Sequence, residues 1–158
     1  LGDVYKRQFI NAMAFGNGGT SVDPTGIITY LTPNSTGTNA SLYNQTYSKV
    51  VDDRSVTNLD PQRNKIETRH VNGTNYTDVL VTCLLDYGEP NGQDAVDQAS
   101  QANSLYVFDE LGLVSFASSG TGKLLTHVVF HPVQKSLNRL IQIDYTVRVQ
   151  SLTGFNEG

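Results

Sequence analysis

The sequence has one cysteine, no tryptophan and no cluster of basic residues, and each scarcity narrows what the chain can be. A single cysteine, Cys83, excludes an intramolecular disulfide, and its apolar neighbours in V-L-V-T-C-L-L predict a buried, unreactive thiol. A lone thiol also favours synthesis in a reducing compartment. Because basic residues are not clustered and the formal net charge is -4, we expect no direct binding to nucleic acid or to an anionic membrane.

Long hydrophobic runs and charged residues are scarce as well. The apolar stretches have only strand length, so the sequence predicts neither a transmembrane helix nor a signal peptide. Charged residues make up 16% of the 158 residues, below the usual globular share, and uncharged Asn, Thr, Ser, Gln and Gly supply the polarity instead. A chain of this length suits one domain with a sizeable core.

The most regular pattern lies between Leu140 and Gln150, in L-I-Q-I-D-Y-T-V-R-V-Q. Apolar and polar residues alternate with a period of two, which predicts a long strand with one buried and one solvated face. Helical spacing would scatter the same apolar residues around a cylinder. The face predicted to be buried contains Ile141, Ile143, Tyr145, Val147 and Val149.

A second strand is predicted at Tyr76–Tyr87, where both faces are apolar, so we expect it to be central in a sheet. The one helix candidate is short, Asp94–Ala102. Six to eight strands predict an all-β or β-rich α+β fold, a single-domain antiparallel sandwich-like sheet with long polar loops and at most one short helix. Further strands are predicted at Phe9–Phe15, Ile27–Leu31, Leu42–Val51, Lys65–Val71, Leu105–Phe108 with Leu111–Phe116, and Leu124–Phe130.

Turns and boundaries are indicated by Gly, Pro and Asn. Asn72-Gly73 predicts a two-residue hairpin turn, and Pro132 is expected to end the Leu124–Phe130 strand, with a connector after it from Val133 to Asn138. Residues 1–8, L-G-D-V-Y-K-R-Q, do not fit the pattern of the chain beyond them and are interpreted as a non-native segment or an arm. The β-rich domain is expected to span residues 9–150, with a C-terminal tail at 151–158.

Three patterns invite a chemical interpretation, and none predicts a reaction centre. Ser118–Leu125 resembles a phosphate-binding loop, but Leu124 occupies the position of the hydroxyl residue that such loops require. His127 and His131 are four residues apart on a predicted strand, about 13 Å, which is too far for one metal ion. The acidic pairs Asp52-Asp53 and Asp109-Glu110 are interpreted as turn residues and solvated edges. We therefore expect no enzyme, and no catalytic, cofactor-binding or metal-binding residues.

The order of features resembles the N-terminal attachment domain of the tail-collar and tail-fibre proteins of tailed bacteriophages. That family opens with an apolar strand and a Gly-rich turn, similar to I-N-A-M-A-F-G-N-G-G at Ile10–Gly19. The similarity continues through S-L-Y-N-Q-T-Y-S-K-V-V at Ser41–Val51, the strand at Val79–Leu85, L-Y-V-F-D-E-L-G-L-V at Leu105–Val114, and the alternating strand at Ile141–Val149. The Phe-acidic run is reordered here, with Phe108-Asp109-Glu110 preceding Leu111-Gly112.

The resemblance implies a non-enzymatic structural protein of a tailed phage particle, made in the host cytoplasm and localised in the virion. It would act as a multi-copy adaptor or connector of the tail, baseplate or fibre-attachment region. Its expected partners are other copies of itself and other virion proteins, with no small-molecule substrate and no membrane insertion. Two alternatives stay open, a head decoration or neck protein of the virion and a carbohydrate-binding β-sandwich module. The loops Thr32–Ser41 and Asp52–Asn64 are predicted to bury against another chain.

Overall fold

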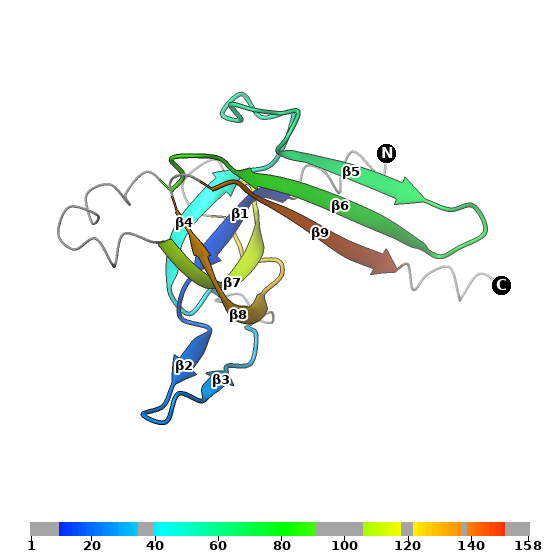
Figure 1. The fold of residues 1–158 in the computed structure, drawn as a ribbon. Helices are drawn as coiled ribbons and strands as arrows, with labels where there is room; N and C mark the ends of the chain where they lie inside the picture. The colour runs from blue at the N-terminus through cyan, green and yellow to red at the C-terminus, as the bar shows by residue number, and fades with distance from the viewer. Residues whose placement is uncertain (1–9, 35–39, 91–105, 118–121, 137–138, 151–158) are drawn as a thin grey trace.

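A computed structural model describes residues 10–34, 40–90, 106–117, 122–136 and 139–150. Within these ranges the protein is all-β, with nine strands and no helix (Figure 1). The strands form antiparallel sheets in one sandwich-like domain, as the sequence predicted. The predicted helix at 94–102 and the terminal segments 1–8 and 151–158 lie outside the described residues. The described part of the chain has no helix long and apolar enough to cross a membrane.

Four strands form the body of the molecule, in the order β4-β1-β7-β8. The central strands are β1 (Ile10–Gly16) and β7 (Tyr106–Ser115), and the edge strands are β4 (Gln45–Val50) and β8 (Val128–Lys135). Because β1 has a neighbour on both sides, six of its seven residues are buried, which explains its nearly unbroken apolar sequence.

The second sheet, which we call the blade, has the order β5-β6-β9. It consists of β5 (Lys65–His70), β6 (Tyr76–Leu85) and β9 (Ile141–Gln150). The sequence placed β6 at the centre of a sheet and a long strand at the C-terminal end, and both predictions are confirmed. The β6–β9 ladder is unbroken over ten residue pairs, and one end of the blade extends well beyond the body (Figure 1).

A third unit, which we call the arm, is the two-stranded hairpin of β2 (Thr20–Val22) and β3 (Ile28–Tyr30). It projects from the opposite end of the body to the root of the blade (Figure 1). An isolated two-stranded hairpin is marginally stable in water, so the arm depends on whatever holds its base.

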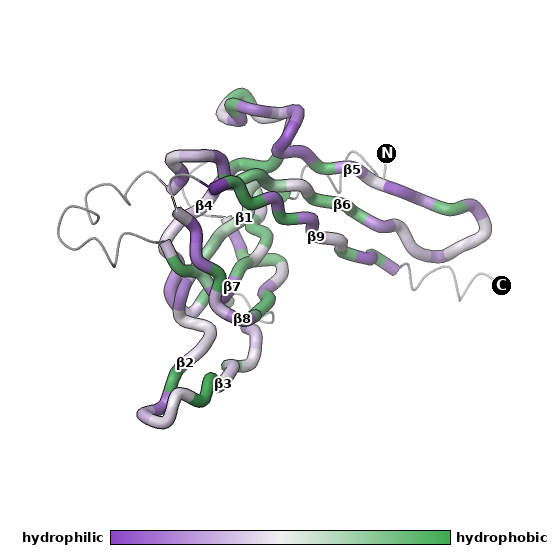
Figure 2. The backbone as a smooth tube through the Cα atoms, in the orientation of Figure 1, coloured by the Kyte–Doolittle hydropathy of each residue, from purple (hydrophilic) through white to green (hydrophobic). Residues whose placement is uncertain are grey.

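The core lies where the body and the root of the blade face each other. The body contributes Phe15 and Phe108, whose rings meet edge to face at 5.3 Å between centroids, a favourable geometry for aromatic pairs. Apolar residues are concentrated in this region, and the blade alternates between apolar and polar residues (Figure 2). The blade residues that are fully or nearly fully buried in this cluster are Ile66, Val79, Val81, Cys83 and Leu85.

The prediction for the last body strand was wrong in its bounds. The strand begins at Val128 and continues through Pro132 to Lys135, so Pro132 does not end it. Proline removes one ladder hydrogen bond, which an edge strand tolerates. Pro132 also lies within an irregularity of the β7–β8 ladder. Phe108 pairs with Val133 and Glu110 pairs with Val129, so the register shifts between these two pairs.

Two other local features differ from, or refine, the prediction. Asn72 and Gly73 form the centre of a turn closed by the N–H of Thr74 on the carbonyl of Val71, at 3.2 Å. Only Gly73 has positive φ, and the ladder starts at His70–Thr77, so this is not the predicted two-residue hairpin. The predicted pieces at 105–108 and 111–116 form one strand, β7, whose pairing with β8 shifts register between Phe108 and Glu110.

Candidate functional site

Glu110 lies in the central strand β7, and its carboxylate holds two loops. The Oε2 atom accepts hydrogen bonds from the backbone N–H groups of Gly18 at 3.0 Å and Asn44 at 2.8 Å. The Oε1 atom accepts one from the N–H of Tyr43 at 2.9 Å. A Cβ on Gly16 would lie 2.6 Å from Glu110 Oε2, so glycine is needed for this close approach.

Asp109, next to Glu110, holds the first residues of the arm. Its Oδ1 accepts the N–H of Gly19 at 2.8 Å, and its Oδ2 accepts the N–H of Thr20 at 3.0 Å and the hydroxyl of Thr20 at 2.5 Å. We call Asp109, Glu110 and their partners the clamp. The interpretation of this acidic pair as solvated edge residues was wrong, because Asp109 is 4% exposed and Glu110 is fully buried.

His127 completes the clamp and attaches the returning end of the arm. Its Nε2 lies 2.7 Å from Glu110 Oε1, and both side chains are fully buried. Its Nδ1 accepts the N–H of Asn34 at 2.6 Å. With Nδ1 accepting, Nε2 must carry the proton and donate to Glu110. The base of the arm is further closed by the N–H of Leu31 on the carbonyl of Gly19, at 2.8 Å.

Two opposing effects act on the charge of Glu110. Burial favours the protonated form, and the hydrogen bonds from Asn44, Tyr43, Gly18 and His127 favour the ionised form. The hydrogen bonds prevail, so the pKa of Glu110 lies below its ordinary value. The clamp therefore holds a charged carboxylate in the interior, stabilised by backbone dipoles and one imidazole.

The arm displays apolar side chains beyond the clamp. Val22 lies opposite Ile28 in the hairpin, and Thr20 lies opposite Tyr30, so Val22, Ile28 and Tyr30 share one face. Val22 and Ile27 are 60% and 62% exposed. At the tip, Asp23 Oδ1 accepts the N–H groups of Thr25 and Ile27, each at 2.9 Å. The arm is thus a preformed projection with uncovered apolar residues.

The loop from Val51 to Asn64 is a second braced projection. Asn58 Nδ2 donates to the carbonyls of Asp52 at 3.0 Å and Asn64 at 2.8 Å, which ties both ends of the loop together. Between these ties, Val56 is 97% exposed and Leu59 is 96% exposed. This internally bonded loop therefore leaves two large apolar side chains uncovered.

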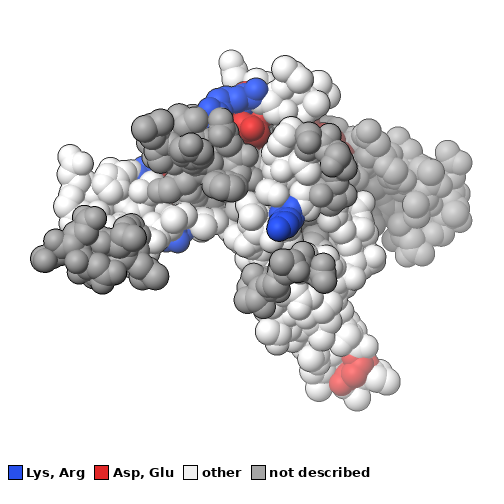
Figure 3. Space-filling model, turned by 180° about the vertical axis from the view of Figure 1, so that it is seen from behind, with Lys and Arg blue, Asp and Glu red and all other residues white. Residues whose placement is uncertain are grey.

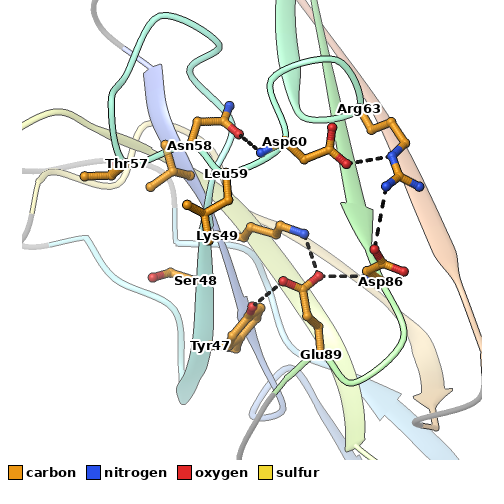
Figure 4. Close-up of a pocket in the computed structure, with 11 residues that line it drawn as sticks. Tyr47, Ser48, Lys49, Thr57, Asn58, Leu59, Asp60, Arg63, Asp86 and Glu89 are labelled. Atoms are coloured by element: carbon orange, nitrogen blue, oxygen red, sulfur yellow. Dashed lines mark hydrogen bonds and ion pairs between the residues drawn. The ribbon is translucent and has the colours of Figure 1, made fainter.

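A hollow of about 680 Å³ lies between this loop and β4 (Figure 4). Its charged side chains are already paired with one another. Lys49 Nζ lies 2.5 Å from Glu89 Oε1 and donates to the carbonyl of Leu84. Arg63 lies 2.6 Å from Asp60 and 3.7 Å from Asp86. The hollow therefore joins the loop, β4 and the end of β6 through ion pairs and presents no free charge to a ligand.

The other residues singled out in the sequence lie apart from the clamp. His131 is exposed on β8, whereas His127 is buried. Asp52 and Asp53 are loop residues that accept the backbone N–H groups of Arg54 and Ile66, as a turn role predicts. Within the described residues, no group of three or more His, Cys, Asp and Glu side chains could hold a metal ion. Residues 118–121 of the loop-like Ser118–Leu125 motif are outside the described ranges.

Comparison with known proteins identifies no relative: no family model, no curated protein and no solved structure matches this chain. The fold defines the class, an antiparallel β-sandwich from which two braced projections extend.

Proposed function

We propose that this protein is a non-enzymatic structural subunit of a tailed phage particle, a multi-copy adaptor of the tail, baseplate or fibre-attachment region. The observation that carries the proposal is the arm: an apolar hairpin projecting from a buried ionic clamp. A projection of this kind has a fixed direction before it meets a partner, so less conformational entropy is lost on binding.

The loop that carries Val56 and Leu59 supports the same proposal. Both projections expose apolar surface and both are held by internal hydrogen bonds. In a solitary protein such surface promotes non-specific association, whereas in an assembly it is covered by a neighbour. Repeated copies multiply contacts that are individually weak.

The surface charge is compatible with packing against other proteins. The face seen from behind is predominantly uncharged (Figure 3). The one charged residue between Thr20 and Asn34 is Asp23, at the tip of the arm. Interfaces are depleted of charge at their centres, which this distribution satisfies.

A carbohydrate-binding role is less well supported. Such sites place exposed aromatic rings against the sugar. The residues that line the 680 Å³ hollow include one aromatic, Tyr47, which is half-buried with its hydroxyl 3.5 Å from Glu89 Oε2. The described residues of the hollow therefore offer no exposed aromatic platform.

Light scattering on the purified protein tests the assembly part of the proposal. We expect a mass above that of the 17.3 kDa protomer. The double variant Val22→Ser, Tyr30→Ser should lower the assembled fraction and leave the unfolding midpoint unchanged, because these side chains contact solvent rather than the core. Thr29→Ser, on the opposite face of β3, is the matched control. A strict monomer that binds a glycan would overturn the proposal.

Mass spectrometry of gradient-purified phage particles tests the virion part. For a phage that carries this reading frame, we expect the protein to co-sediment with particles in several copies per particle. Its presence in the lysate and absence from intact particles would refute a structural role in the virion.

A further inference from the structure

The outer edge of β9 has a residue sequence that is complementary to itself in the antiparallel direction. Within the described residues, β9 has a single neighbour, β6, so its other edge is unpaired. The strand is ten residues long, which is about 33 Å of backbone donors and acceptors. Edges of this length are usually blocked or covered, because they pair readily with another strand.

We propose that β9 pairs antiparallel with β9 of a second copy, around a two-fold axis at Thr146, to form a continuous six-stranded sheet. The proposal rests on the proposed multi-copy function and names the surface through which two copies meet. In this register Asp144 lies opposite the partner's Arg148, and Arg148 lies opposite the partner's Asp144. Opposite charges in directly facing positions stabilise antiparallel pairs.

The opposite-charge pairing occurs in only one register near the middle of the strand. The side chains of two facing residues lie on the same face of the sheet. The two-fold axis must therefore lie at a residue, and every such axis keeps polar residues opposite polar ones. An axis at Asp144 or at Arg148 places that residue against itself, which is repulsive. An axis at Tyr145 or Val147 places the two charged residues opposite uncharged side chains.

The charges continue this complementarity across the whole sheet. In the described ladder, Lys65 faces Thr82, which faces Asp144. Arg69 faces Asp78, which faces Arg148, and Arg148 is bound to Asp78 at 2.8 Å and 3.2 Å. Joined at the axis, the row reads Lys65, Thr82, Asp144, then the partner's Arg148, the partner's Asp78 and the partner's Arg69, and its five charged residues alternate in sign.

The other face of the strand is complementary as well. Tyr145 would lie opposite the partner's Val147, and Ile143 opposite the partner's Val149. Aromatic and β-branched residues are favourable cross-strand neighbours. Val149, 40% exposed in one copy, would gain an apolar neighbour.

Cross-linking tests the register directly. Thr146→Cys places a thiol opposite its own copy, so mild oxidation should give a covalent dimer. Asp144→Cys alone should stay monomeric on a non-reducing gel, whereas a mixture of Asp144→Cys and Arg148→Cys should cross-link. The native thiol, Cys83, is buried and does not compete. If Thr146→Cys gives no dimer, or Asp144→Cys alone cross-links as well, the proposed register is wrong.

Charge exchange tests the pairing without a covalent bond. Asp144→Arg leaves two positive residues at the axis of each strand, and Arg148→Asp leaves two negative residues. Each variant alone should dimerise about tenfold less well, because two attractive pairs become two repulsive ones. Mixed together, they should form a heterodimer of higher affinity than either variant's homodimer, since both facing pairs across the axis are again of opposite charge. Circular dichroism checks that each variant is folded.

The outcomes separate this inference from the proposed function. An oligomeric wild-type protein that neither cross-links through Thr146→Cys nor recovers on mixing refutes β9 pairing and leaves the adaptor proposal standing. A protein that passes both tests but is absent from phage particles keeps the dimer and loses the virion role.

Discussion

Replacing Glu110 by Gln removes charge and one acceptor from the clamp while keeping its shape. The carboxylate serves four donors with two oxygens, Gly18 and Asn44 at Oε2, and Tyr43 and His127 at Oε1. An amide has one oxygen, so in either orientation its NH₂ group faces two N–H donors. His127 offers limited relief, because moving its proton to Nδ1 sets that proton against the N–H of Asn34.

The size of the effect is set by two lost bonds. A hydrogen bond to a charged group contributes about 1.5–3 kcal/mol, and two buried donors lose their acceptor. We expect Glu110→Gln to lower the free energy of unfolding by about 3–6 kcal/mol, a large part of the roughly 5–15 kcal/mol of a typical domain.

Urea denaturation monitored by circular dichroism measures this loss. Glu67→Gln is the control, because Glu67 is exposed on β5 and its charged contact with Lys65 is long, at 3.9 Å. Removing the charge of Glu67 should change the free energy of unfolding by less than about 0.5 kcal/mol. The pKa of folded Glu110 is lowered, so its contribution is present above the unfolded pKa of about 4.3 and is lost as the pH falls through the folded value. The gap between wild type and Glu110→Gln should therefore be full at neutral pH and close in acid. A variant within about 0.5 kcal/mol of wild type at pH 7 would show that the clamp does not hold the arm through this carboxylate.

Two further predictions concern packing. Gly112→Ala should lower the free energy of unfolding by more than about 2 kcal/mol, because its Cβ would lie 2.2 Å from the Thr126 carbonyl oxygen. Gly26 lies in open space at φ +90, so Gly26→Ala should lower the free energy of unfolding by about 1–2 kcal/mol through backbone strain alone. Equal urea midpoints for the two variants would contradict this prediction. Burial raises the pKa of Cys83 to about 12. A thiol-specific reagent at pH 8 should therefore label Cys83 only as fast as the protein unfolds. Rapid labelling of the native protein would mean that the two sheets open at the core.

The sequence predicted the fold well wherever one residue pattern determines the structure. Period-two alternation located β9, and apolar residues on both faces placed β6 at the centre of its sheet. The misplaced strand at 124–130 shows the limit of such rules, because Pro132 is excluded from a central strand but tolerated at an edge. Whether a strand is central or at an edge depends on pairing between distant segments, which local sequence does not contain.

The clamp was not predictable by the same reasoning. Adjacent acidic residues on a regular strand point to opposite faces, which favoured a solvated interpretation of Asp109-Glu110. Both side chains are nevertheless buried, because their hydrogen-bond donors come from residues 66 to 92 positions away in the chain, which local sequence does not show. One signal in the sequence was G-N-G-G at Gly16–Gly19, since a Gly-rich turn exposes N–H groups that a carboxylate can accept.

In the proposed assembly, the clamp supports one contact surface, the arm, and the blade edge supplies another. Burying a carboxylate is costly unless hydrogen bonds replace its water, and here Glu110 and Asp109 use those bonds to fix the base of a hairpin that would be marginal by itself. The arm and β9 leave the body in different directions (Figure 1). In the proposed dimer, contact at the blade is symmetric and ends at two copies, whereas the proposed contact through the arm is directional and continues to a further subunit. In the proposed adaptor, these two contacts together join pairs of copies to a larger ring or tube.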